Sequence, residues 1–142
     1  MTDPLSIATG LIALIQVTAQ ATIYLKDVND GGKERTKMRD ELRSLTCLLE
    51  MIHDRVEEQR EPENEDGLNP AAMAYLSGPD GPLERMKVTM EEIVSKLAPQ
   101  AGFRRLAQPF KWPFEKKDAL ELFGAMERLK SHFTLVLQND LL

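Results

Sequence analysis

The sequence predicts an all-α fold, a bundle of four to five helices with an apolar N-terminal helix at its centre. Three observations predict it. The run from Pro4 to Leu25 has no charged side chain. Three later segments repeat apolar residues at spacings of three and four, which is the period of one helix face. No segment shows the sustained alternation of apolar and polar residues that is typical of a half-buried strand.

The N-terminal helix is expected to begin at Pro4, because Asp3 precedes it as a capping acceptor and proline suits the first helical turn. It is expected to end at 29–32, a cluster of Asn, Asp and two Gly. A helix over Pro4 to Leu25 would be about 33 Å long, close to the ~30 Å hydrocarbon core of a bilayer. Its apolar residues lie on most sides, which favours a central buried position.

The later helices are predicted from their apolar seams. The helix at 33–60 has the seam Met38, Leu42, Leu45, Leu49, Ile52 and Val56. The next helix has the seam Leu83, Met86, Met90, Ile93 and Leu97, and is expected to stop at Ala98 because the residue before Pro99 disfavours helix. The last helix, 115–138, has Leu122, Met126, Leu129, Phe133 and Val136. A short helix is expected at 70–76, after an exposed acidic loop at 61–70.

Length and composition favour one domain, residues 1–142, expected to be the N-terminal domain of a longer protein. The net charge of −5 is unfavourable for nucleic-acid binding, which needs clustered Lys and Arg. The single cysteine, Cys47, cannot form an intrachain disulfide and is expected to be a small buried thiol in a reducing cytosol. The methionines are expected to be core fillers.

The sequence has no motif typical of catalysis, such as a nucleophile elbow, a phosphate loop or a zinc-protease helix. His53 and His132 fall on different predicted helices without ligand-spaced partners. We therefore expect no enzyme activity, no cofactor and no metal.

The uncharged N-terminal run has two interpretations. It lacks the positive residues of a signal peptide, and Thr2 replaces the glycine that myristoylation needs. One interpretation is a buried bundle helix and nothing more. The other is a helix that leaves the bundle and inserts into a membrane after self-assembly, since polar side chains in lipid need partners. The candidates for insertion are Leu5, Ile7, Leu11, Ile12, Leu14 and Ile15, and the polar stripe beside them is Ser6, Thr9, Gln16 and Gln20.

A basic and aromatic segment, 103–117, departs from the acidic balance of the chain. Its aromatic side chains could close one end of the bundle while the basic ones reach water. Alternatively, the segment could dock on anionic lipid, because basic residues are attracted to such a surface and tryptophan prefers the headgroup layer. The candidate lipid contacts are Arg104, Arg105, Lys111, Trp112, Lys116 and Lys117.

Three stretches carry a resemblance to a known family: DPLSIATGLIALIQ at 3–16, GPLERMKVTMEEIVSKL at 81–97 and KWPFEKKDALELFGAMERLKSHFTLVLQND at 111–140. They resemble the N-terminal region of many fungal proteins of the STAND class, the NLR-like relatives of innate immune receptors. These regions resemble HeLo-like domains. They are distantly similar to the four-helix bundle of the mixed-lineage kinase domain-like effector and to the N-termini of plant helper immune receptors.

The resemblance implies a helical-bundle module of programmed cell death or membrane targeting. It implies a homo-oligomer on activation, anionic lipids as possible partners, and a nucleotide-binding domain in the same or a partner chain. It also implies a cytoplasmic resting state and action at the plasma membrane. The alternative is a non-lytic helical adaptor that assembles with other proteins. The 142 residues contain no nucleotide-binding domain, repeat domain or amyloid-type motif of their own.

Overall fold

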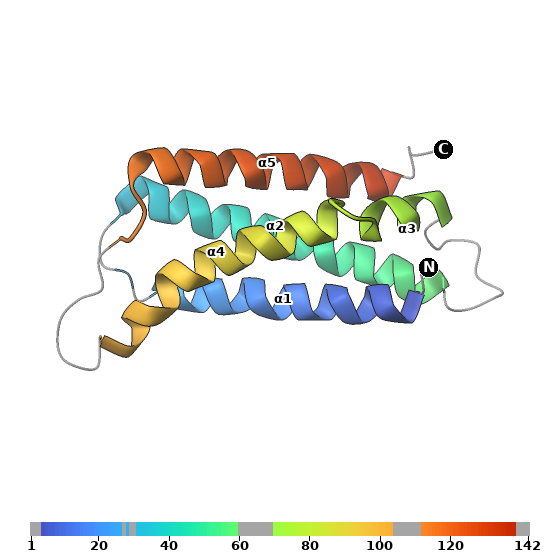
Figure 1. Cartoon of the computed structure of the whole chain (residues 1–142), viewed down its shortest axis with the longest axis horizontal. Coiled ribbons are helices and arrows are strands. Elements are labelled where there is room, and N and C mark those ends of the chain that lie inside the picture. The colour runs from blue at the N-terminus through green and yellow to red at the C-terminus, as the bar shows by residue number, and fades with distance from the viewer. Residues whose placement is uncertain (1–3, 27, 29–30, 60–69, 104–111, 139–142) are drawn as a thin grey trace.

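Four long helices and one short helix form the bundle in Figure 1, a computed structural model that describes residues 4–26, 28, 31–59, 70–103 and 112–138. For residues 59 and 98–103 it describes the backbone. The helices are α1 (Pro4–Lys26), α2 (Gly32–Gln59), α3 (Pro70–Ser77), α4 (Pro82–Phe103) and α5 (Lys116–Gln138). The predicted all-α fold with an apolar N-terminal helix is confirmed. Asp3 and the predicted loop at 61–69 lie outside the described residues.

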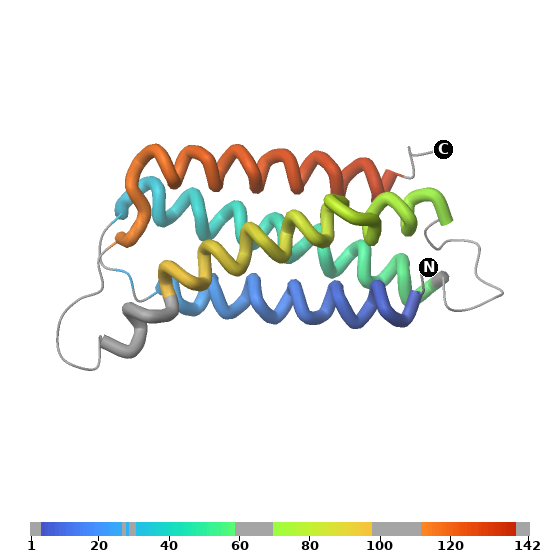
Figure 2. The backbone as a smooth tube through the Cα atoms, viewed as in Figure 1, coloured from blue at the N-terminus to red at the C-terminus, as the bar shows by residue number. Residues whose placement is uncertain are grey.

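The long helices occupy the corners of the bundle. α1 packs mainly against α2 and α4, and α5 packs against the same two helices, so α1 and α5 lie at opposite corners. The short helix α3 packs on α4. The smooth backbone trace shows α1 and α4 running in one direction and α2 and α5 in the other (Figure 2).

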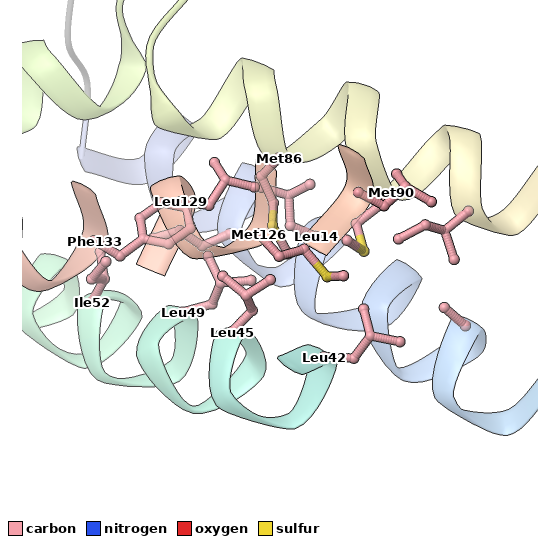
Figure 3. Close-up of a cluster of buried hydrophobic side chains, with 14 of the residues drawn as sticks. Leu14, Leu42, Leu45, Leu49, Ile52, Met86, Met90, Met126, Leu129 and Phe133 are labelled. Carbon is pink, nitrogen blue, oxygen red and sulfur yellow. The ribbon is translucent and has the colours of Figure 1, made fainter. Parts of the chain in front are cut away.

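The three predicted seams form the core. All six seam residues of α2 and the four from Met86 to Leu97 on α4 have no solvent exposure, and those of α5 are buried as well. Figure 3 shows side chains from α1, α2, α4 and α5 meeting there, among them Leu14, Leu45, Met86 and Phe133. Each such side chain stabilises the fold by about 1.5–3 kcal/mol through its removal from water.

The N-terminal helix is not surrounded by the other helices as expected. α1 lies at a corner, and 33% of its most apolar window is buried. Its buried residues are Ile7, Ala8, Leu11, Leu14, Thr18, Ala21 and Leu25. Apart from Ala8, they follow the same spacing of four and three as the other seams. Only one face of α1 therefore enters the core.

Three smaller expectations are also wrong. α4 continues past Pro99 to Phe103, since proline removes one backbone donor and the preference of its predecessor is a bias that a helix can overcome. Cys47 is exposed because it follows the seam residue Leu45 by two positions and so points away from the core. Met51 is exposed for the same reason, two positions after Leu49.

A polar link joins α2 to α5 beside the core. Lys130 Nζ lies 2.8 Å from Glu41 Oε2 and 2.8 Å from Glu127 Oε1. The pKa of Lys130 is raised above 10.5, first by its hydrogen bond to Glu127 and then by the one to Glu41. The pKa of Glu127 is lowered below 4.5, chiefly by the hydrogen bond from Lys130. Glu41 is buried, so the ammonium of Lys130 compensates a carboxylate that has little access to water.

Lys130→Met should lower the free energy of unfolding by about 1–3 kcal/mol at neutral pH, because it leaves Glu41 buried without its partner. The Glu127 contribution is complete above about pH 4.5 and is lost as pH falls through the lowered folded pKa. The Lys130 contribution is complete below about pH 10.5 and is lost as pH rises through the raised folded pKa. The difference between wild type and variant should therefore shrink at both ends of a pH series of urea titrations. Lys87→Met, on the exposed face of α4, is the control and should show no such window.

The connection between α1 and α2 depends on a glycine. Gly31 has a φ of +97°, and its carbonyl accepts hydrogen bonds from the amides of Glu34 and Arg35 at the start of α2. A Cβ at Gly31 would lie 2.8 Å from the Trp112 ring, so the indole packs directly on the glycine backbone. Trp112 Nε1 donates to Glu34 Oε2 over 3.1 Å, and its ring lies 4.9 Å from that of the buried Phe114.

Gly31→Ala should destabilise the fold by about 1–3 kcal/mol or more, because it combines an unfavourable φ with a clash against Trp112. Gly10→Ala is the matched control. A Cβ at Gly10 meets nothing within 4 Å, so this change should stabilise α1 by about 0.5–1 kcal/mol. Thermal unfolding followed by circular dichroism would measure both, and equal shifts for the two variants would contradict the role of Gly31.

Candidate functional site

The outward face of α1 is the most unusual surface of the described chain. Leu5 is 53% exposed, Ile12 44% and Ile23 55%. Together with Ala19, which is also exposed, they recur at spacings of seven, seven and four along one side of α1. We call Leu5, Ile12, Ala19 and Ile23 the exposed stripe. A surface helix of a soluble protein normally carries charged side chains here, and α1 has none before Lys26.

The candidate insertion residues are therefore divided between two faces. Ile7, Leu11 and Leu14 are buried in the core, Ile15 is half-buried, and Leu5 and Ile12 belong to the exposed stripe. The sequence indicates this division only weakly. The core face follows the spacing 7-11-14-18-21-25, but it includes Thr18 and Ala21, which are less apolar than the exposed Val17 and Ile23.

The polar stripe lies beside the exposed stripe. Ser6, Thr9, Gln16 and Gln20 are all exposed, as their common spacing predicts. Thr9 Oγ1 donates to the Leu5 carbonyl over 2.9 Å, and Gln20 Nε2 donates to the Tyr24 hydroxyl over 2.7 Å. These bonds stay within α1.

The same holds for the other threonines of α1. Thr18 Oγ1 donates to the Leu14 carbonyl over 2.7 Å, and Thr22 Oγ1 donates to the Thr18 carbonyl over 3.0 Å. A polar group in an apolar medium is costly mainly when it lacks a hydrogen-bond partner. Because these hydroxyls are bonded within α1, their transfer to an apolar medium needs no partner from another helix. The polar content of α1 is therefore a weaker barrier to membrane entry than its sequence indicates.

A groove lies between α1 and α4, and α4 crosses α1 obliquely (Figure 1). The volume of the groove is about 530 Å³. The α1 wall includes the small residues Ser6, Gly10 and Ala13 beside Ile7, Leu14 and Val17. The α4 wall is formed by Leu83, Glu84, Lys87 and Glu91. The open space over Gly10 is part of this groove. Small residues along one helix face allow a second helix to approach closely. The α1 side of the groove and the exposed stripe are both uncharged, whereas the α4 side of the groove carries charged side chains.

By length and composition, α1 is the one helix in the described part of the chain that could cross a membrane. The core helix of a soluble protein can pass the same test, and one such helix is weak support for a membrane role. The distribution of its side chains carries more information than its length. Four of the nine Leu, Ile and Val side chains of α1 are exposed to solvent: Leu5, Ile12, Val17 and Ile23.

Three of the candidate lipid contacts lie at the end of the bundle where α1 ends, and the other three are not among the described residues. Lys116 and Lys117 are exposed in the first turn of α5. Trp112 is half-buried between Gly31 and Phe114, where it closes this end of the bundle. Arg104, Arg105 and Lys111 lie outside the described residues.

Comparison of the chain with models of protein families, with characterised proteins and with solved structures finds no match. The surface of α1 must therefore be interpreted from its own chemistry.

The two histidines lie apart from this surface. His53 is close to Asp54 and Glu57 on α2, at 3.7 and 3.9 Å. His132 Nδ1 shares a short hydrogen bond with the Tyr75 hydroxyl, which ties α5 to α3. No group of three or more His, Cys, Asp or Glu side chains that could hold a metal occurs among the residues described.

Proposed function

We propose that the chain is a HeLo-like effector domain that acts on membranes when α1 is released from the bundle during self-assembly. The observation that carries the proposal is the surface of α1. It is uncharged on every side up to Leu25, and its exposed stripe is apolar even while its other face is packed in the core. The resemblance of residues 3–16 to the N-termini of fungal STAND proteins supports the same assignment.

The energetics favour transfer of α1 to lipid over its release into water. Ile7, Leu11 and Leu14 each gain about 1.5–3 kcal/mol from burial in the bundle. Lipid tails are as apolar as these side chains, so that gain is retained in a membrane. The side chains of the exposed stripe, which contact water in the bundle, would also be removed from water in a membrane. The apolar side chains of α1 are thus placed at least as favourably in lipid as in the bundle, whereas polar side chains such as Gln16 need partners there.

Release of α1 destabilises the helices that remain in the bundle. α2 and α4 would lose the seam of α1 that fills the space between them, and unfilled core space costs several kcal/mol. This cost keeps α1 in the bundle at rest. Self-assembly compensates for it if bundles or released helices pack against one another, and the small residues of the α1–α4 groove permit such close packing.

Ile12→Lys tests the membrane step without unfolding the bundle. Ile12 is exposed, so the folded state should change by less than about 0.5 kcal/mol. A lysine near the centre of a membrane helix costs about 2.5–3.5 kcal/mol, which is roughly a hundredfold in insertion. With assembly forced by a C-terminal ligand-inducible dimerisation domain, dye release from lipid vesicles should be strong for the wild type and nearly absent for this variant.

Val88→Lys is the matched control, because Val88 is a β-branched residue with 57% exposure on α4. It should leak dye as the wild type does. Wild-type bundles that assemble without releasing dye, or an Ile12→Lys variant that releases it fully, would contradict the proposal.

The basic segment is proposed to bring the domain to anionic membranes. Charge reversal of Lys116 and Lys117 together with Arg104 and Arg105 should weaken binding, since each near-surface basic residue contributes about 1 kcal/mol. Co-sedimentation with phosphatidylserine vesicles should fall at least about tenfold. Lys87→Glu, a charge reversal on the exposed face of α4, serves as the comparison. Unchanged co-sedimentation of the fourfold variant would refute this step.

A second candidate function is a non-lytic adaptor. The observation that favours it is that the exposed stripe and the α1–α4 groove are open in the resting bundle, so a partner helix could bind them without release of α1. Expression of residues 1–142 and of a form lacking residues 1–25 in a fungal cell separates the two. The effector function predicts a loss of viability that depends on residues 1–25. The adaptor function predicts that both cultures stay healthy and that both forms of the protein stay in the cytosol.

A further inference from the structure

A small basic pocket lies where the last turn of α1 meets the first turns of α2. In Figure 1 this is the end of the bundle at which α1 ends and α2 begins. The pocket has a volume of about 240 Å³ and is lined by Leu25, Lys26, Arg35, Thr36 and Arg39. It is separate from the exposed stripe and from the α1–α4 groove, which lies nearer the start of α1.

Three of these five lining residues carry positive charge, and none of the five carries a carboxylate. Asp40 forms an ion pair with Arg39, 3.7 Å from its Nε, which is longer than a hydrogen bond. The Asp40 side chain is largely exposed. Asp27 and Asp30 are outside the described residues. Three cations held around one small space repel one another, and an anion between them would remove that repulsion.

The donors of the pocket are incompletely used. Arg35 Nε and Arg39 Nε are both enclosed by the protein, and neither has a hydrogen-bond partner. A buried nitrogen without a partner is costly, by an amount comparable to a lost hydrogen bond. Thr36 differs, because its hydroxyl already donates to the Gly32 carbonyl. The two Nε atoms are covered by protein, so a ligand in the pocket would meet the outer nitrogens of the two guanidinium groups and the ammonium of Lys26.

We propose that this pocket binds the phosphate group of a phosphomonoester. A guanidinium presents parallel N–H donors that match the oxygens of phosphate, and two of them with a lysine suit a doubly charged tetrahedral anion. The volume holds a phosphate group with a small substituent, and it is below the range of about 300–1,000 Å³ typical of sites for drug-sized ligands. The group can come from a soluble metabolite or from a lipid headgroup.

The position of the pocket gives the ligand a structural effect. Lys26 belongs to α1, whereas Arg35 and Arg39 belong to α2. A bound phosphate joins the end of α1 to α2 and stabilises their contact. This site does not depend on the membrane role proposed for α1, because its binding residues are outside the exposed stripe.

Inorganic phosphate is the first probe. The melting temperature of the wild-type chain should rise with phosphate concentration, against sodium chloride at matched ionic strength, as expected for a ligand that binds the folded state. Arg35→Gln and Arg39→Gln should each require roughly tenfold more phosphate for the same rise, since each removes a charge-assisted pair of bonds. Arg43→Gln is the control: it makes the same charge change on the exposed face of α2, outside the pocket, and should respond like the wild type.

Vesicles distinguish the two sources of phosphate. Phosphatidic acid presents a phosphomonoester. Phosphatidylglycerol, which presents a phosphodiester, is the anionic lipid for comparison. Binding of free phosphate that is weakened in Arg35→Gln and Arg39→Gln assigns the pocket to soluble phosphates. Binding only to phosphatidylcholine vesicles that contain phosphatidic acid, with the same dependence on both arginines, assigns it to a lipid headgroup. The proposal is overturned if the wild type binds neither probe, or if both variants bind as Arg43→Gln does.

Discussion

The packing of a single seam holds α1 in the bundle. Ile7, Leu11, Leu14 and Leu25 lie against α2 and α4, and no charged residue on the other side of α1 anchors that face in water. Most bundle helices are held by both effects, apolar contacts inward and charge outward. In this chain the second is absent from α1, so the position of α1 depends on the fit of one face. The membrane proposal follows from this imbalance.

The seams of α2, α4 and α5 could be predicted from the sequence, because apolar and charged residues alternate there with a clear helical period. Leu42 stands between Glu41 and Arg43 and Leu45 between Ser44 and Thr46, and the contrast identifies the core face. On α1 that contrast is missing. Ile12 and Leu14 are equally apolar, and only the packing of the neighbouring helices decides that Leu14 is buried and Ile12 exposed.

The basic pocket could not be predicted from the sequence, because it depends on how the helices pack. Lys26 and Arg35 come together because α1 and α2 run antiparallel around the turn at Gly31, which no spacing along the chain expresses. The basic and acidic residues of α2 are nearly equal in number along the sequence. The structure pairs Glu34 with Trp112 and Glu41 with Lys130. Arg39 forms an ion pair with Asp40 at 3.7 Å, and neither Arg35 Nε nor Arg39 Nε has a hydrogen-bond partner in the part of the chain that the structure describes. Local charge depends on which acids are engaged elsewhere.

The contact between Gly31 and Trp112 has an optical consequence. The chain has one tryptophan, and its indole rests on the backbone of the turn that joins α1 to α2. Indole emission shifts to longer wavelength when the ring moves from an apolar setting into water. Any rearrangement that pulls α1 away at this turn would therefore change the fluorescence of the unlabelled protein. The fold carries a native reporter at the joint where α1 would separate from the bundle, so the opening of this joint can be timed directly in solution.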